Sequence, residues 1–324
     1  NTISANLSGN SASTTIDIEA SGAPTFAGSA VVTNLQSNSG EGLNSATNGG
    51  SVIAATIAGE DDGEVNALAG GLSVQGNTVS SSVVANSAIG VTPGTAGNRI
   101  LIDDALSFDG AGGGTPGSTI AYDSGSVGAT VVADLVILNS QGSIGDPVGG
   151  DRQTWSSSTT GASIGATVQS LDGGSVTLAD NEVTASSTGN IASNAIASGE
   201  GAASFDGTVA LANQQSNYYA DTSATAAGTT IAVVTAPGSL DGGVTNDATI
   251  GVEDNRSAAT AYGSDVGQSI ALESNTLGAG GARVQLTGGT GPDGNASAGG
   301  AFTVTNLQAS YNSNTTATNA ASMI

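Results

Sequence analysis

The pentapeptide VTNLQ occurs twice in the chain, at Val32–Gln36 and again at Val304–Gln308. The flanking residues match as well, because the first copy lies in AVVTNLQSNSG and the second in FTVTNLQASYN. A globular enzyme has little reason to repeat such a segment near both ends of its chain. A protein that is built from one recurring structural unit does have a reason.

A looser form of the same frame recurs between the two pentapeptides. Each copy alternates apolar and other residues over a short run and then continues into Asn, Asp, Gln or Gly. This alternation is typical of a β-strand that ends in a polar turn, and no helical period is sustained. The copies read AVVTNLQSN at Ala30, LSVQGNTVS at Leu72, LVILNSQGS at Leu135, VTLADNEVT at Val176, VALANQQSN at Val209, IGVEDNRSA at Ile250 and FTVTNLQAS at Phe302, with a weaker copy, ISANLSGN, at Ile3.

The spacing of the copies predicts a fold class. Four of the six start-to-start spacings lie close to multiples of about 21 residues, which is a natural length for one rung of a β-solenoid. We therefore expect an all-β, elongated parallel β-helix with rungs of about 20 residues. About sixteen such rungs at ~4.8 Å each would form a rod of roughly 75 Å. Tandem β-sandwich domains are the alternative fold.

The frame extends from end to end, so residues 1–324 are predicted to form a single elongated domain. Both termini, about 1–20 and 312–324, are strand-like and carry no charged helical cap. We expect them to pair with other subunits, because uncapped strands favour head-to-tail addition. The opposing interpretation is that they fray or dock on their own chain. The candidate interface residues are Ile3, Leu7, Ile16, Ile18, Met323 and Ile324.

The polar residue after each strand suggests a structural role for asparagine. Stacked side-chain amides hydrogen-bond to one another, so copies of the frame in successive rungs would form a ladder at one corner of the solenoid. A ligand-binding role for these amides is the less favoured interpretation. The ladder residues are Asn34, Asn77, Asn139, Asn181, Asn213, Asn255 and Asn306.

Composition excludes several classes of function. The 324 residues include 27 carboxylates against four arginines, giving a formal charge of −23, so nucleic acid would be repelled. The absence of His, Cys and Lys removes the usual bases, thiol nucleophiles and Schiff-base amines, and no catalytic residue is predicted. Asp103 and Asp104 form a carboxylate pair, yet the aromatic residues that hold sugar rings in glycosidases are scarce. No apolar stretch is long enough to span a membrane.

Calcium is the one cofactor that the sequence suggests. Glu60, Asp61, Asp62 and Glu64 crowd a glycine-containing loop, and hard carboxylate oxygens are suited to Ca²⁺. A solvated acidic loop is the competing interpretation, and Asp146 with Asp151, Asp241 and Asp293 are weaker candidates. A separate hypothesis concerns Tyr218, Tyr219, Tyr262 and Tyr311. These tyrosines either form an exposed aromatic strip or pack over the corners of the solenoid.

The spaced Asn and Gln residues of DNEVTASSTGNIASNAIASG and TNLQASYNSNTTATNAAS, in a glycine-rich chain without lysine, resemble bacterial extracellular β-strand-repeat proteins. Curlin-type fibre subunits and holdfast-anchor proteins are the families that come nearest. The resemblance implies a secreted protein of the bacterial cell surface, with itself as partner in a homopolymer, and implies no catalytic residues.

The function expected from these observations is a structural subunit of an extracellular bacterial filament or surface adhesive layer, assembled head-to-tail by strand pairing. Cell-surface or matrix polysaccharide is a second expected partner. The alternative function is a solenoid module that binds or cleaves polysaccharide, such as a lyase.

Overall fold

The computed structural model describes residues 1–19, 25–57, 67–68, 70–90, 95–102, 106–110, 117–121, 127–146, 148–198, 204–235, 244–245, 247–272, 282–288 and 295–324. These residues form β-strands that are joined by turns, and none of them is helical. The prediction of an all-β protein is confirmed.

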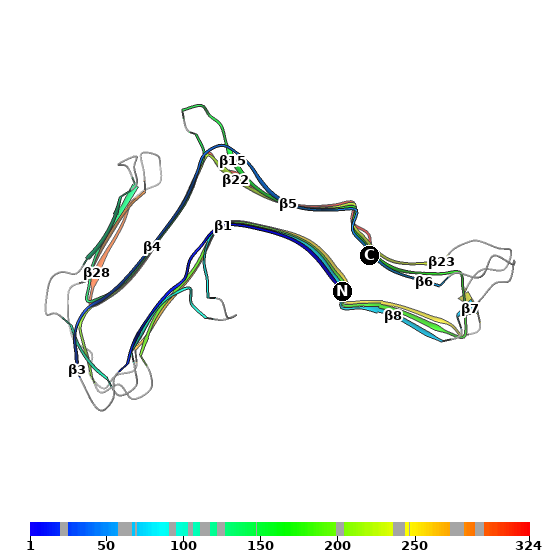
Figure 1. The fold of residues 1–324 in the computed structure, drawn as a ribbon, viewed down its shortest axis with the longest axis horizontal. Helices are drawn as coiled ribbons and strands as arrows, with labels where there is room; N and C mark the ends of the chain where they lie inside the picture. The colour runs from blue at the N-terminus through cyan, green and yellow to red at the C-terminus, as the bar shows by residue number, and fades with distance from the viewer. Residues whose placement is uncertain are drawn as a thin grey trace.

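The chain follows nearly the same course four times, and we call each course a passage (Figure 1). The first passage consists of β1 (Thr2–Ser11), β2 (Thr14–Ile18), β3 (Thr25–Gly28), β4 (Ala30–Ser39), β5 (Gly42–Gly49), β6 (Val52–Ile57), β7 (Ala67–Leu68) and β8 (Gly71–Gln75). The second consists of β9 (Thr78–Ala88), β10 (Asn98–Ile102), β11 (Ser107–Gly110), β14 (Leu135–Ile144), β15 (Gln153–Thr160), β16 (Ser163–Val168), β17 (Ser170–Asp172) and β18 (Ser175–Ala179).

In the third passage one long strand, β19 (Glu182–Ser198), pairs with both β9 and β10. It is followed by β20 (Phe205–Asp206), β21 (Val209–Tyr218), β22 (Ala220–Ala227), β23 (Thr230–Thr235), β24 (Val244–Thr245) and β25 (Thr249–Glu253). The fourth passage contains β26 (Arg256–Ala271), β29 (Phe302–Tyr311) and β30 (Thr315–Ala320), and then Met323 bridges to Thr230.

Equivalent strands of successive passages pair in parallel and in register. The sheet that contains both pentapeptides has the order β29-β21-β14-β4. Within it Val32 lies opposite Ile137, Ile137 lies opposite Leu211, and Leu211 lies opposite Val304. The two copies of VTNLQ therefore occupy the same place in the first and the fourth passage.

The predicted rung of about 20 residues is wrong. Side-chain amides that bond between equivalent positions of neighbouring passages are between 74 and 105 residues apart in the chain. The error arises because the recurring frame occupies two places in each passage. Four copies lie in the sheet of β4, and those at Leu72, Val176 and Ile250 lie in the separate sheet β25-β18-β8. Alternate copies are stacked, and consecutive copies are not.

Two hairpins account for much of the difference in passage length. β12 (Gly117–Ala121) and β13 (Val127–Val132) precede β14, while β27 (Ala282–Gly288) and β28 (Asn295–Gly300) precede β29. Together they form the antiparallel sheet β12-β13-β27-β28, which packs through an apolar layer against the outer face of β14 and β21. Between the named strands of the described chain, antiparallel pairing is confined to this sheet. The tandem β-sandwich alternative is therefore not supported.

The space between the facing sheets is divided into three compartments. One end is apolar and centres on Ile100, Phe108 and Leu135, and the other apolar end is built around Ile164 and Leu178. The part between them combines two small apolar clusters, around Trp155 and Ala224, with buried polar side chains. Asn86, Asn190, Ser157 and Thr159 are all buried there.

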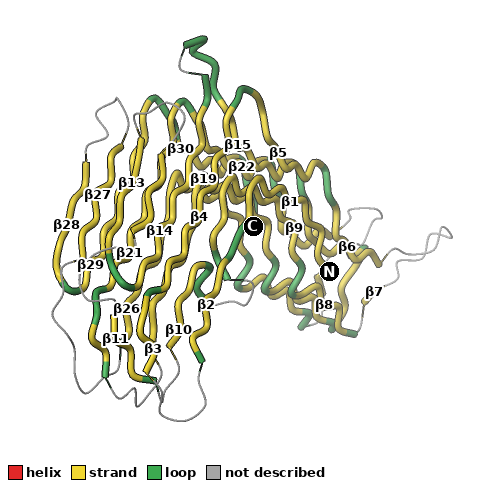
Figure 2. Tube along the Cα trace, turned by 60° about the vertical axis from the view of Figure 1, so that its left-hand side comes forward, coloured by secondary structure: helices red, strands yellow, loops and turns green. Residues whose placement is uncertain are grey.

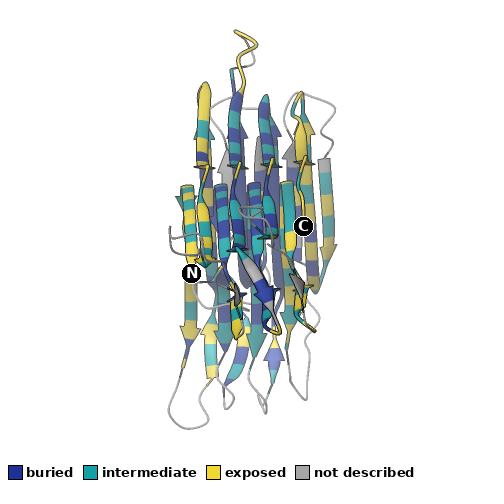
Figure 3. Ribbon diagram, turned by 90° about the vertical axis from the view of Figure 1, so that its right-hand side faces the viewer, coloured by how far each residue is buried: buried dark blue, intermediate teal, exposed yellow. Residues whose placement is uncertain are grey.

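The molecule is a plate rather than a rod. Figure 1 looks down its shortest axis, and along that axis the strands of the four passages lie over one another. Figure 2 shows the same strands side by side. Four levels at ~4.8 Å make a stack only about 19 Å deep, so the predicted rod of roughly 75 Å and sixteen rungs is wrong. Burial follows the levels, since the middle strands are mostly buried and the outer ones are largely exposed (Figure 3).

Candidate self-association edges

A column of glutamines runs through all four passages along the sheet of β4. Gln36, Gln141, Gln215 and Gln308 lie at equivalent positions of β4, β14, β21 and β29. Each of the last three donates its Nε2–H to the Oε1 of the glutamine in the preceding passage, at 2.8 Å in every case. Gln36 ends the column by donating to the carbonyl of Ser87 at 2.7 Å. The three bonds between glutamines thus all donate toward the first passage.

A neighbouring column of asparagines has the opposite direction. Asn139 donates its Nδ2–H to Asn213 at 2.7 Å, and Asn213 donates to Asn306 at 2.8 Å. At the other end of the column, Asn98 of the facing strand β10 lies between Asn34 and Asn139. It accepts from Asn34 at 3.2 Å and donates to Asn139 at 3.3 Å. The donors in this column point toward the fourth passage.

The remaining predicted ladder residues form a second, separate column. Asn77 donates to Asn181 at 2.8 Å, Asn181 donates to Asn255 at 2.9 Å, and Asn1 donates to Asn77 at 3.1 Å. Asn77, Asn181 and Asn255 lie in the turns that precede β9, β19 and β26, and Asn1 precedes β1. All seven predicted asparagines take part in amide columns, but the expectation of one common corner is wrong because the frame occupies two places in each passage.

Sequence reasoning missed a column of phenylalanines. The chain contains four phenylalanines, and all of them stack in one column, one for each passage. The ring centroids of Phe26 and Phe108 are 5.7 Å apart, those of Phe108 and Phe205 are 4.9 Å apart, and those of Phe205 and Phe302 are 6.1 Å apart. The phenylalanines lie at unequal sequence separations from the copies of the frame, so the frame does not reveal the column. Their number, one for each passage, is the signal that could have indicated it.

Three of the four tyrosines that the sequence analysis named cluster at the end of the sheet β29-β21-β14-β4. Tyr218 stacks on Tyr311 with ring centroids 5.0 Å apart, and Tyr219 meets both rings edge-on. Tyr262 lies on β26 and is half exposed. A continuous strip of all four tyrosines is therefore not formed.

The first passage presents an open backbone edge. Within the described residues, β1, β4 and β5 pair on one side only, with β9, β14 and β15. Four of the predicted interface residues belong to this passage, yet their side chains pack into the interior. Ile18 is buried, and Ile3, Leu7 and Ile16 are partly buried against the core. The outward-facing part of this edge is its backbone.

The fourth passage presents the matching edge. Among the described strands, β26, β29 and β30 each pair on one side, with β19, β21 and β22. Their inward-facing side chains have no further level above them. Val304 is 53% exposed, whereas Leu211 at the equivalent position is fully buried. Met323 and Ile324 are also more than half exposed.

The uncovered interior continues over β25 of the third passage. Ile250 and Val252 are 41% and 43% exposed, while their equivalents in β18, Val176 and Leu178, are fully buried. An apolar surface therefore accompanies the open backbone on the side of the stack where the chain ends. Among the described residues, this is the pattern of a strand stack whose last level has no further strand above it.

The predicted calcium loop, Glu60, Asp61, Asp62 and Glu64, lies outside the described residues, as do Asp103, Asp104, Asp241 and Asp293. Within the described part of the chain, no group of three or more acidic side chains is arranged to hold a metal ion. Asp146 accepts a hydrogen bond from the backbone N–H of Val148 at 2.8 Å, as in an ordinary polar turn. No helix that could cross a bilayer was found among the described residues.

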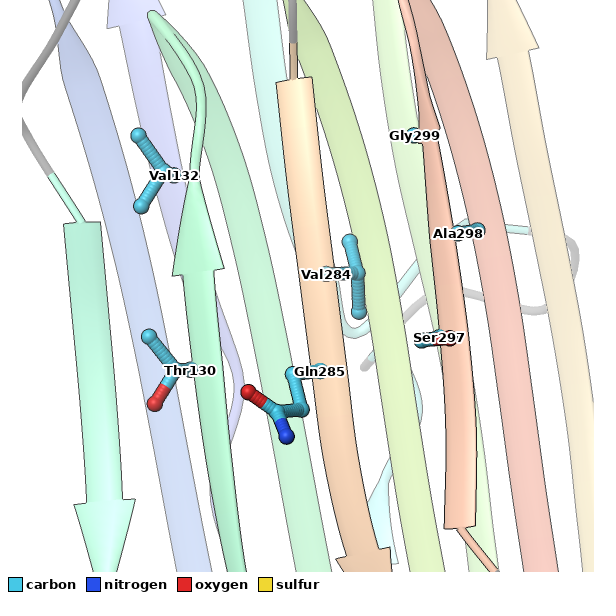
Figure 4. A pocket seen from close by; sticks show the side chains of 7 residues that line it. All are labelled: Thr130, Val132, Val284, Gln285, Ser297, Ala298 and Gly299. Carbon is cyan, nitrogen blue, oxygen red and sulfur yellow. The ribbon is translucent and has the colours of Figure 1, made fainter.

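A groove lies on the outer hairpin sheet. It is lined by Thr130 and Val132 of β13, Val284 and Gln285 of β27, and Ser297, Ala298 and Gly299 of β28 (Figure 4). These side chains supply two hydroxyls and one amide but no acid or base. The groove therefore offers no proton donor or nucleophile–base pair for catalysis.

No protein-family model matches the chain, and searches of curated proteins and of solved structures likewise found no match.

Proposed function

We propose that the four passages are the coils of a short β-solenoid, and that the chain serves as a non-catalytic structural subunit of an extracellular bacterial filament or surface adhesive layer. Copies join end to end, with the fourth passage of one against the first passage of the next. The observation that carries this proposal is the pair of open backbone edges at opposite ends of the stack, where β26, β29 and β30 are the equivalents of β1, β4 and β5. Edges of this kind are templates for pairing with another chain.

The thickness of the plate strengthens the argument. Two of its four levels are end levels, so a large share of its inward-facing apolar side chains has cover on one side only. Stacking a second copy would remove Val304 from water, and burial of such surface contributes roughly 25 cal/mol per Å² before the cost of association. A thick rod would gain less from stacking in proportion to its size.

Negative-stain electron microscopy and sedimentation of the purified 324-residue chain test this role. We expect unbranched filaments, or a series of end-to-end oligomers that grows with protein concentration. Val304→Lys should abolish them, because it places a charge on the apolar end surface while remaining solvated in the monomer. Val148→Lys is the matched control, since Val148 is 95% exposed in a turn away from both edges.

A chain that remains a monomer at all concentrations would contradict the role. So would Val304→Lys and Val148→Lys variants that assemble equally well.

A further inference from the structure

The repeated pentapeptide specifies how two copies meet. This inference rests on the proposed function and adds the register and polarity of the joint. The two VTNLQ segments lie on the outermost strands of one sheet, β4 and β29, at equivalent positions. The inner strands carry ILNSQ and LANQQ at these positions, which preserve Asn and Gln but not the complete pentapeptide. Identity is thus restricted to the two strands that face outward.

We propose that β29 of one copy pairs in parallel with β4 of a second copy, in the register that sets Val304 opposite Val32, Asn306 opposite Asn34 and Gln308 opposite Gln36. In this register Leu307 also lies opposite Leu35. A shift by two residues would place Val304 opposite Asn34 and leave an apolar side chain against an amide. Only the proposed register brings identical residues together at all five positions.

The amide columns also agree with this polarity. Gln308 donates toward the first passage, so its Oε1 faces the open end and can accept from Gln36 of the next copy. Asn306 accepts from Asn213, and its Nδ2–H can donate to Oδ1 of Asn34 in the next copy. Both columns therefore continue across a head-to-tail joint without reversing direction. A head-to-head joint would set two donors or two acceptors against each other.

The backbone N–H and C=O groups on the two open edges also fit this register. Val209 donates its N–H to the carbonyl of Ala301, so alternate residues from Ala301 onward direct their backbone groups toward β21. The residues between them, among them Val304 and Asn306, direct theirs to the open edge. On β4, Ala30 donates to Asp134 of the second passage, so the backbone groups of Val31 and Leu35 are directed to the open edge. These two sets interleave when the pentapeptides are aligned, and they do not interleave after a shift by one residue.

Disulfide trapping tests the register directly, because the chain contains no cysteine. Ser37 and Ala309 are equivalent positions on the outward face of the sheet. Their Cα atoms would be ~4.8 Å apart in the proposed joint, within the range that a disulfide bridges. Ser37→Cys and Ala309→Cys are prepared as separate single variants, mixed, and oxidised mildly under conditions that give filaments.

The expected result is a mixed disulfide dimer as the main product of that mixture, with neither variant cross-linking alone. Ser39→Cys mixed with Ala309→Cys is the matched control, because the two-residue offset sets the Cα atoms beyond ~7 Å and should prevent the bond. Filaments whose mixed dimer comes mainly from the Ser39→Cys pair would overturn the register while the proposed function stands. Filaments in which Ser37→Cys cross-links with itself would overturn the polarity. A chain that forms neither filaments nor cross-links would overturn both the joint and the proposed function.

Discussion

Gln215 shows how much one side chain contributes to the stack. It is fully buried, donates to Gln141, accepts from Gln308, and makes a third bond to the carbonyl of Asp265 at 2.9 Å. Gln308 occupies the equivalent position at the open end and is exposed. The side-chain amide of Gln215 in the third passage therefore has a glutamine neighbour on both sides, whereas that of Gln308 in the fourth passage has one on one side.

Replacement of Gln215 by Ala should lower the free energy of unfolding by about 2–3 kcal/mol, because it leaves buried partners without their hydrogen bonds. Gln308→Ala, the matched control, should lower it by about 1 kcal/mol or less, since water can replace the lost partner. Urea denaturation of both variants at a concentration where the chain is monomeric measures the difference. Equal losses would contradict the idea that the glutamine column stabilises the interior.

Sequence reasoning identified individual column residues but not their complete set. The asparagines of the recurring frame were recognisable because one side-chain type recurs directly after an apolar alternation. Asn98 was not recognisable, because it belongs to the facing sheet and only the folded chain inserts it between Asn34 and Asn139. Amide columns that join two sheets follow from tertiary structure and leave no local pattern.

At the scale of elements, the sheet formed by β1, β9, β19 and β26 contains an interruption. Regular pairing omits one position of each strand, namely Gly9, Ala85, Gly189 and Gly263. A Cβ on Gly189 would lie 2.4 Å from the carbonyl oxygen of Gly263, and one on Gly9 would lie 2.5 Å from that of Ala85. Gly9 and Gly189 require glycine because the neighbouring backbone occupies the space of a side chain there, whereas β9 accommodates the Cβ of Ala85 at the equivalent position.

Gly189→Ala should therefore lower the free energy of unfolding by about 2–3 kcal/mol, as expected for overpacking that only a backbone shift can relieve. Gly49→Ala is the control. A Cβ at Gly49 would meet nothing within 4 Å, so its stability should stay the same or rise by up to about 1 kcal/mol. Thermal and urea unfolding of the two variants test this contrast, and a Gly189→Ala variant as stable as the parent would contradict it.

The strands were predictable from the sequence, whereas their partners were not. Alternation of apolar and polar residues marks a strand wherever it lies, and the predicted frames at Ala30, Leu135 and Val209 are strands. The frame at Leu72 has the same local pattern, yet it pairs in a different sheet. Spacings near multiples of 21 residues reflected two frames in each passage rather than a short rung. The paired strands of the sheet β29-β21-β14-β4 are 74 to 105 residues apart in the chain. A local pattern of apolar and polar residues does not record which distant strand will be the partner.

At the scale of the whole molecule, charge opposes the proposed stacking. Each copy has a formal charge of −23, and stacked copies would repeat every ~19 Å. The Debye length is ~30 Å at about 0.01 M salt and ~10 Å at about 0.1 M, so repulsion between neighbours is screened only in the second condition. Two surface ion pairs, Arg152–Asp221 and Arg256–Glu182, join passages within one copy and do little to offset this charge.

End-to-end association should therefore strengthen as salt rises from about 0.01 M to about 0.1 M. Sedimentation velocity at fixed protein concentration should show a shift from monomer to larger species. The Val304→Lys variant should remain monomeric in both conditions, which separates specific stacking from precipitation by salt. Association that weakens as salt is added would show that attraction between charges, not strand pairing, holds the copies together.

The shallow depth of the plate has a consequence for diffraction. A fibre of head-to-tail copies would carry two periodicities along its axis, the ~4.8 Å spacing of adjacent strands and a longer one of about 19 Å from each four-level plate. The hairpin sheet of β12, β13, β27 and β28 protrudes from one face once in every copy and would give the longer period its contrast. Oriented fibres should then show a low-angle meridional reflection near the fourth multiple of the strand spacing, a signature that an uninterrupted cross-β stack lacks.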